Sequence, residues 1–179
     1  MARNGQTVMS AVEIYGFGGQ DTMEAAINFK NAKILPSSVT NCAIHNSLGW
    51  GARILHSGGD VTKRATGLAA GEAGGIVFSN NFIFNVRPHG LVVSYSKNGI
   101  VDGNIIMKVV GRGKDTDSYK DREGGIVFGW GDFADDTRMG NFTMNSNIVA
   151  NARTAAYWAR GHSCDDPNVY FVNNTAHSN

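Results

Sequence analysis

The chain has 179 residues, of which 42% are hydrophobic, and its 16 basic and 15 acidic residues leave a net charge of +1. This length suits one domain with a core. The balanced charge argues against a protein that depends on long-range attraction to nucleic acid or anionic lipid. No apolar run approaches the roughly 18 residues of a transmembrane helix, so we expect no membrane insertion of this segment.

The N-terminus lacks the continuous apolar stretch of a signal peptide. We therefore expect either an intracellular chain or an internal piece of a longer protein. The 23 glycines, with only 3 prolines, favour an ordered all-β chain with many tight turns over a disordered one.

Taken in chain order, short strand-like segments recur from residues 24–30 onward. A phrase of Asn followed by apolar residues, with Cys in place of Asn at its first occurrence, returns at 42–46, 81–85, 104–108, 147–151 and 174–178. A second strand-like run follows the first four phrases, at 50–55, 89–94, 124–129 and 155–160. A third apolar element precedes each phrase, at or near Val39, Val77, Ile100, Phe142 and Val169.

The spacing between the first positions of these phrases is 39, 23, 43 and 27 residues. The two short values set a period of about 23 to 27 residues. The long spacings contain Gly-rich or charged stretches, which we predict to be surface loops. The predicted insertions are 57–74, 111–123 and 131–138.

Three short strands per period, without a helical pattern between them, predict a right-handed parallel β-helix. We expect about 5 to 6 coils, with residues 1–179 forming one segment. A β-sandwich is the main alternative, but it does not explain why the same phrase returns at a fixed place in each period. Residues 21–33 have helical propensity, and they also fit the strand pattern.

The first position of each phrase predicts a structural ladder at a corner of the coil. An inward amide there can hydrogen-bond its equivalents in the adjacent coils, about 4.8 Å away, which keeps buried amides paired. Asn also tolerates the left-handed conformation of a sharp corner, so we expect one residue to serve both needs. The expected ladder residues are Cys42, Asn81, Asn104, Asn147 and Asn174, with Cys42 as a small buried replacement.

The two cysteines, Cys42 and Cys164, lie about three coils apart in the predicted solenoid, which corresponds to roughly 15 Å of stacking. A disulfide needs Cα atoms within about 7 Å. We therefore expect no bond between them, and Cys164 is expected either to pair outside this segment or to remain a thiol.

Several stretches together resemble the parallel β-helix region of fibrocystin and fibrocystin-L. They are GFGGQDTMEAAINFKN (16–31), SSVTNCAIHNSLGWGARILHS (37–57), NNFIFNVRPHGLVVSYSKNGIVDGNII (80–106) and GHSCDD (161–166). The landmarks are Gly19-Gln20, Asn41-Cys42, His45 and Cys164-Asp165, within a resemblance that covers about residues 12–178.

This resemblance implies a fragment of a long ectodomain, extracellular or at the cell surface, including cilia and flagella. The implied partners are neighbouring domains of the same chain, other surface proteins and glycans. The extended superfamily is similar to cell-surface hyaluronidases that carry G8 modules. The missing signal peptide departs from this pattern unless the chain is a fragment.

Two acidic clusters are candidates for chemistry. Paired carboxylates could serve glycoside hydrolysis or bind calcium. Apart from this possible calcium ion, we expect no cofactor. The spacing matches no loop motif, and basic neighbours neutralise the second cluster, so a solvated loop is the favoured interpretation. The residues are Asp132, Asp135 and Asp136 in one cluster and Asp115, Asp117, Asp121 and Glu123 in the other.

Arg53, Arg87 and His89 form a third candidate group, because a polysaccharide lyase needs a base and a cation. The RPHG stretch that contains two of them also suits a plain corner, which we favour. The remaining histidines predict no metal site, because two lie within the repeated phrase and two have no partner at ligand spacing. They are His45, His177, His56 and His162.

Trp50, Trp130 and Trp158 lie at or beside the second strand-like runs. Core packing is favoured for them over an exposed platform for sugars. Two glycosylation sequons occur, at 141–143 and 173–175. The second falls in the Asn corner and is expected to be buried, which leaves Asn141 as the better site in a secreted chain.

These observations and the resemblance favour a structural or adhesive β-helix module that presents an outer face to protein or glycan partners. Two alternatives stay open. One is a lyase or hyaluronidase-like enzyme on the same fold, for which no catalytic residue is assigned. The other is a self-assembling filament scaffold, because exposed strand edges invite further pairing.

Overall fold

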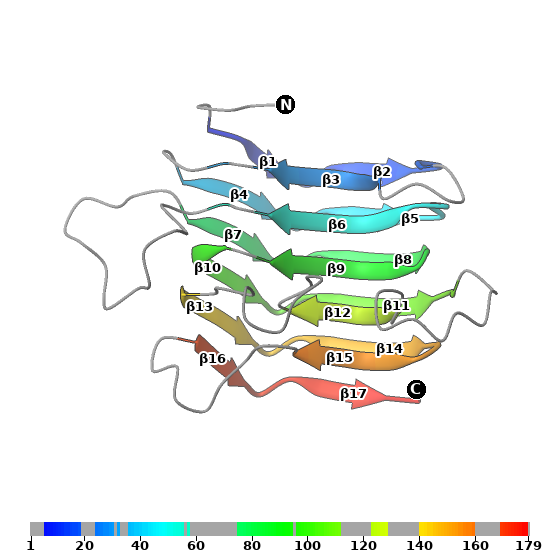
Figure 1. The fold of residues 1–179 in the computed structure, drawn as a ribbon. Helices are drawn as coiled ribbons and strands as arrows, with labels where there is room; N and C mark the ends of the chain where they lie inside the picture. Colours follow the sequence, from blue (N-terminus) through cyan, green and yellow to red (C-terminus); the bar gives the residue numbers. More distant parts are fainter. Residues whose placement is uncertain are drawn as a thin grey trace.

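The computed structural model describes residues 6–18, 24–30, 32, 36–55, 57, 75–94, 96–111, 123–128, 140–159 and 169–178. Within these ranges the chain winds into six stacked coils of short strands (Figure 1). The coils follow one another in chain order from the N-terminal end of the stack to the C-terminal end. The three predicted insertions lie almost wholly outside the described residues.

The strands form three parallel sheets. The first sheet contains β1 (Val8–Ser10), β4 (Ser37–Thr40), β7 (Ile76–Ser79), β10 (Lys97–Asp102), β13 (Gly140–Asn145) and β16 (Val169–Val172). The second sheet contains β2 (Glu13–Tyr15), β5 (Ala43–His45), β8 (Phe82–Val86), β11 (Ile105–Val109), β14 (Ile148–Ala152) and β17 (Thr175–His177). The third sheet contains β3 (Ala25–Lys30), β6 (Trp50–Leu55), β9 (His89–Ser94), β12 (Gly124–Phe128) and β15 (Ala155–Ala159). This arrangement confirms the predicted parallel β-helix.

The interior is filled by columns of equivalent side chains from successive coils. Ile44, Ile83 and Ile106 are Cα partners across β5, β8 and β11, and each is fully buried. A shift of one residue in any strand would move its apolar side chains to the outer face. The strand register is therefore fixed by the requirement to bury these columns.

A column of glycines in the third sheet allows the coils to approach closely. A Cβ added to Gly51 would lie 2.5 Å from the carbonyl oxygen of Gly90, and one added to Gly90 would lie 2.5 Å from that of Gly125. Real Cβ atoms do not come so close to backbone atoms, so these positions require glycine. Part of the high glycine content therefore belongs to strand interiors and not to the tight turns expected from the sequence.

At the corner between the first and second sheets, the left-handed backbone and the inward amide expected of one Asn belong to two residues. The left-handed residue is the one before each ladder position: its φ is 54° at Asn41 and 53° at Asn80. Asn81, which follows, faces inward and is 1% exposed. The prediction that one residue serves both needs was wrong, because an inward side chain and a left-handed backbone fall on consecutive residues of this corner.

Candidate functional site

The predicted ladder residues lie one above another inside the corner between the first and second sheets. Oδ1 of Asn104 accepts from the backbone N–H of Asn81 at 2.9 Å and from its Nδ2 at 3.0 Å. Oδ1 of Asn147 accepts from the same two groups of Asn104 at 3.1 and 2.9 Å. Asn174 does the same for Asn147 at 3.0 and 2.9 Å.

Each ladder amide also donates to the coil that precedes it. Nδ2 of Asn81 donates to the carbonyl oxygen of Val39 at 3.0 Å, and Nδ2 of Asn104 donates to that of Phe78 at 2.9 Å. The amides of Asn81, Asn104 and Asn147 therefore use their hydrogens and oxygens within the protein. They stabilise the stack and offer no group to a ligand.

Cys42 occupies the ladder position of the second coil. Its backbone N–H donates to Oδ1 of Asn81 at 3.0 Å, and its Sγ donates to the carbonyl oxygen of Thr40 at 3.3 Å. The residue is buried and carries a free thiol. Cys164 lies outside the described residues.

A second interior stack, made of serines, lies where the third sheet leads back to the first. The backbone N–H of Ser57 donates to Oγ of Ser96 at 3.3 Å, and Oγ of Ser57 accepts from the backbone N–H of Ala32 at 3.3 Å. This stack was not predicted from the sequence, because serine is common at turns. Its signal is the spacing: Ser57 and Ser96 are 39 residues apart, as are Cys42 and Asn81.

The outer surface of the second sheet carries a column of rings, of which Tyr15 is exposed and His45 and Phe84 are half-buried. Tyr15, His45 and Phe84 are Cα partners in three successive coils, and they point outward because the isoleucines beside them point inward. The rings of Tyr15 and His45 stack with centroids 5.8 Å apart, and those of Phe84 and Phe82 stack at 5.9 Å. We call Tyr15, His45 and Phe84 the aromatic column.

Tyr15 is the most exposed ring of the aromatic column, at 69%, and several side chains beside the column are exposed as well. Nζ of Lys108 lies 5.6 Å from the centroid of the Phe84 ring, which is within the range of a cation–π interaction. Phe82, Ile105 and Ile148 form a neighbouring outward row, each about two-fifths exposed.

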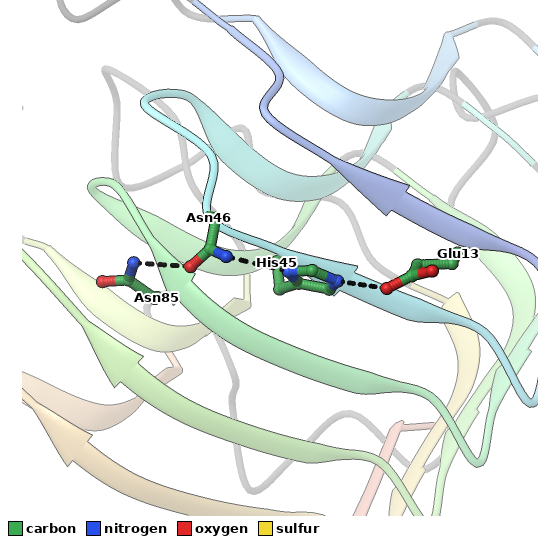
Figure 2. Close-up of polar contacts among 4 residues, drawn as sticks. All are labelled: Glu13, His45, Asn46 and Asn85. Carbon is green, nitrogen blue, oxygen red and sulfur yellow. Dashed lines mark hydrogen bonds and ion pairs between the residues drawn. The ribbon is translucent and has the colours of Figure 1, made fainter.

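A chain of polar contacts runs beside the aromatic column and links the first three coils (Figure 2). Nε2 of His45 lies 2.8 Å from Oε1 of Glu13, and Nδ1 of His45 lies 3.1 Å from Nδ2 of Asn46. Nδ2 of Asn85 donates to Oδ1 of Asn46 at 2.8 Å. Asn46 and Asn85 hold the same left-handed corner position, with φ of 54° and 53°.

The aromatic column and the chain of polar contacts beside it combine the chemistry that carbohydrate binding requires. Aromatic rings present flat apolar faces, and the planar amide and carboxylate groups beside them accept and donate hydrogen bonds. Among the residues that the structure describes, no group of three or more His, Cys, Asp or Glu side chains is placed to hold a metal ion. The acidic clusters proposed for calcium or hydrolysis lie outside this part, apart from Glu123.

Two of the three proposed lyase residues, Arg53 and His89, lie against the ring of the same buried tryptophan. On the third sheet, the ring of Trp50 meets that of His89 edge-on at 4.8 Å. Cζ of Arg53 lies 5.3 Å from the centroid of the Trp50 ring, and burial lowers the pKa of the Arg53 guanidinium. Trp50 and His89 are only 1% and 2% exposed, and Arg53 is half-buried, so the rings of Trp50 and His89 do not face a polymer in solution.

Arg87, the third member of that group, lies at the corner that precedes β9. Its backbone N–H donates to the carbonyl oxygen of Gly49 at 3.1 Å. Trp158 packs against the same buried cluster as Trp50. Trp130, His56 and His162 lie outside the described residues, whereas His177 is exposed on β17.

The two sequons differ from expectation. Asn173, the acceptor of the second sequon, is exposed at the corner, where its Nδ2 donates to Oδ1 of Asn145 at 3.2 Å. Only its neighbour Asn174 belongs to the ladder. The prediction that this sequon is buried was therefore wrong, because it treated the corner and the ladder as one residue. Asn141 lies in β13.

A stack of parallel coils with polar ladders in its interior defines a solenoid protein of the β-helix class. The chain matches the family model described as a right handed beta helix region over residues 5–179, and it belongs to that family. No curated protein and no solved structure matches the chain. The described residues contain no helix of the length and hydrophobicity that crossing a membrane requires.

Proposed function

We propose that this β-helix is a structural and adhesive module that binds an extended carbohydrate chain along the aromatic column. The observation that carries the proposal is the register of Tyr15, His45 and Phe84, whose rings lie one per coil on the outer side of the second sheet. The amides of Asn46 and Asn85 lie beside them.

The geometry suits a polymer better than a small molecule. Neighbouring parallel strands are about 4.8 Å apart, so the column offers one ring per coil over the first three coils. Small ligands usually need a concave pocket, whereas a chain can gain many weak contacts on a flat side. The hydrogen-bonded coils hold these groups in place before binding, which lowers the entropy cost of association.

The proposal includes the location of the protein. The resemblance to fibrocystin and fibrocystin-L supports an extracellular or cell-surface protein in which neighbouring domains and other surface proteins are further partners. The exposed acceptor Asn173 is compatible with such a location, because N-linked glycans need an accessible sequon in the folded protein.

Catalysis on the same fold is a weaker candidate. Two of the residues that suggested it, Arg53 and His89, surround a tryptophan that is 1% exposed, and a general base must come within about 3 Å of its substrate proton. Incubation with hyaluronan, pectate and alginate, with and without calcium, tests this candidate directly. Release of shorter products would replace binding with catalysis as the function.

Electrophoresis through native gels that contain a soluble polysaccharide tests binding. Hyaluronan, pectate, alginate and a neutral β-glucan are used in separate gels, and we expect at least one to retard the protein. The change Tyr15→Ala should weaken retardation by roughly three- to tenfold, as expected for the loss of one aromatic contact. Tyr170→Ala is the matched control, because Tyr170 is 53% exposed but lies on the first sheet.

The proposal fails if no polysaccharide retards the protein, or if Tyr170→Ala weakens retardation as much as Tyr15→Ala. Size-exclusion chromatography at several protein concentrations tests whether a second copy of the chain covers the aromatic column instead. A particle that grows with concentration, and returns to a monomer when Ile148 is changed to Asn, would mean that a second copy covers this side and that the chain is a scaffold.

A further inference from the structure

We infer that His45 determines the hydrogen-bonding polarity of the corner beside the aromatic column, so that its charge decides whether Asn85 offers an acceptor or a donor to a ligand. The ligand part of this inference rests on the proposed function. The polarity itself is a property of the protein alone and follows from the chain of contacts in Figure 2.

The direction of the chain is fixed at its Glu13 end. An ionised carboxylate only accepts hydrogen bonds, so Nε2 of His45 donates to Oε1 of Glu13 across 2.8 Å. A neutral imidazole then has one nitrogen left, Nδ1, which accepts. Nδ2 of Asn46 lies 3.1 Å from Nδ1 and is the matching donor.

The orientation of each asparagine follows from the one before it. Because Asn46 turns its amide nitrogen to His45, it turns Oδ1 to Asn85 and accepts from Nδ2 of Asn85 at 2.8 Å. Nδ2 of Asn85 is thus directed to Asn46, and its Oδ1 faces away from that contact. With neutral His45, the far end of the chain therefore presents an acceptor.

Protonation of His45 reverses this order. A proton taken from solvent onto Nδ1 makes both ring nitrogens donors, and Nδ1–H then faces the amide hydrogens of Asn46. The mismatch is relieved when Asn46 turns its amide over, so that Oδ1 accepts from Nδ1–H. Asn85 then turns over as well, and the far end presents the donor group Nδ2.

The backbone does not oppose these rotations. Asn46 and Asn85 are held at φ of 54° and 53° by the corner, and only the terminal torsion of each side chain has to change. Histidine is the side chain whose charge ordinarily changes between about pH 5 and 8.

Few other charged or titratable groups face His45 among the described residues. On β2 these are Glu13, its partner, and Tyr15, whose ring stacks on the imidazole. On β8 the Cα partner of His45 is Phe84, which does not titrate. Lys108 of β11 lies over the ring of Phe84 and not over the imidazole. The polarity of the chain therefore depends on the charge of His45 and Glu13.

Nuclear magnetic resonance of the ligand-free protein tests the inference. The ¹⁵N side-chain amide signals of Asn46 and Asn85 are followed from pH 4.5 to 8.5, together with the imidazole signals of His45. We expect both amides to shift with the same midpoint as the imidazole. Asn151 is the internal control, because it holds the same corner position, with φ of 54°, but follows Ala150 instead of a histidine.

Two variants make the result decisive. His45→Phe keeps a ring that can stack on Tyr15 but cannot titrate, and it should abolish the shifts of Asn46 and Asn85. Glu13→Gln replaces the fixed acceptor with a group that also donates, and it should change the midpoint of all three residues together.

The inference is overturned if His45 titrates while the two amides stay still, if their shifts persist in His45→Phe, or if Asn151 moves with them. None of these outcomes depends on a polysaccharide. The gel experiment and this titration can therefore fail independently, and loss of the titration alone would leave the proposed binding intact.

Discussion

The side-chain oxygen of Asn104 accepts two hydrogen bonds from Asn81, one from the backbone N–H at 2.9 Å and one from Nδ2 at 3.0 Å. One oxygen thus satisfies a backbone donor and a side-chain donor of the adjacent coil. The two residues are 23 positions apart in the sequence, and the contact forms only when one complete coil separates them.

We expect Asn104→Ala to destabilise the protein by roughly 3 kcal/mol, because it leaves a buried N–H of Asn81 and a buried carbonyl of Phe78 without their partner. Urea unfolding measures this change. Asn151→Gly is the control, because it alters an exposed corner residue of positive φ and should change stability by less than about 0.5 kcal/mol. Equal effects of the two changes would contradict the role given to the ladder.

The ladder can be extended by one residue. In Cys42→Asn, the new Oδ1 would face the first coil and the new Nδ2 would face Oδ1 of Asn81, which now accepts from the backbone N–H of residue 42 at 3.0 Å. We expect a gain of about 0.5–1 kcal/mol from the added hydrogen bonds. Cys42→Ala, which adds none, should lose stability. A loss for Cys42→Asn as large as that for Cys42→Ala would show that the first coil cannot accept the amide.

The glycine column gives a prediction about close approach. Gly90→Ala would place a methyl group 2.5 Å from the carbonyl oxygen of Gly125 and 2.5 Å from Cγ2 of Ile106, so we expect a loss of about 3 kcal/mol. In Gly16→Ala the added Cβ has no neighbour within 4 Å, although φ is +66°. That change should cost only about 1 kcal/mol of backbone strain. Thermal and urea unfolding of both variants will show whether steric crowding dominates, and the reverse order would exclude it.

Tyr157 predicts a dependence on alkaline pH. Burial raises its pKa from 10.0 to about 12, and its hydroxyl lies 2.6 Å from the carbonyl oxygen of Asn147 and 2.9 Å from that of Thr175. The folded state holds the phenolic proton more tightly than the unfolded state. Its contribution to stability is therefore complete below pH 10 and is lost as the pH rises towards 12.

Urea unfolding of the wild type and of Tyr157→Phe between pH 8 and 11.5 measures this effect. The variant should be less stable by about 1 kcal/mol at pH 8, because it lacks the hydroxyl hydrogen bond. The difference should shrink above pH 10, because only the wild type then loses the stability that the protonated hydroxyl of Tyr157 contributes. Curves that stay parallel over the whole range would rule out Tyr157 as the cause.

The repeated phrase was sufficient to predict the architecture. An apolar residue two positions after each ladder residue, as in Ile44, Ile83 and Ile106, requires one inward column, and a constant period places the copies in successive coils. The serine stack and the glycine column have the same periodicity. They were not identified because serine and glycine are also the ordinary residues of turns.

The sequence by itself determined that this chain is a solenoid, because the repeat encodes which residues must meet their own equivalents. Only the tertiary structure decided which side of each strand faces solvent and which corner residues meet. It exposed Tyr15 and Phe82 while burying Trp50, and it joined Glu13 to Asn85 through His45 and Asn46. The physical reason is that strand alternation leaves two possible faces, and the choice between them depends on packing between coils that no single repeat contains.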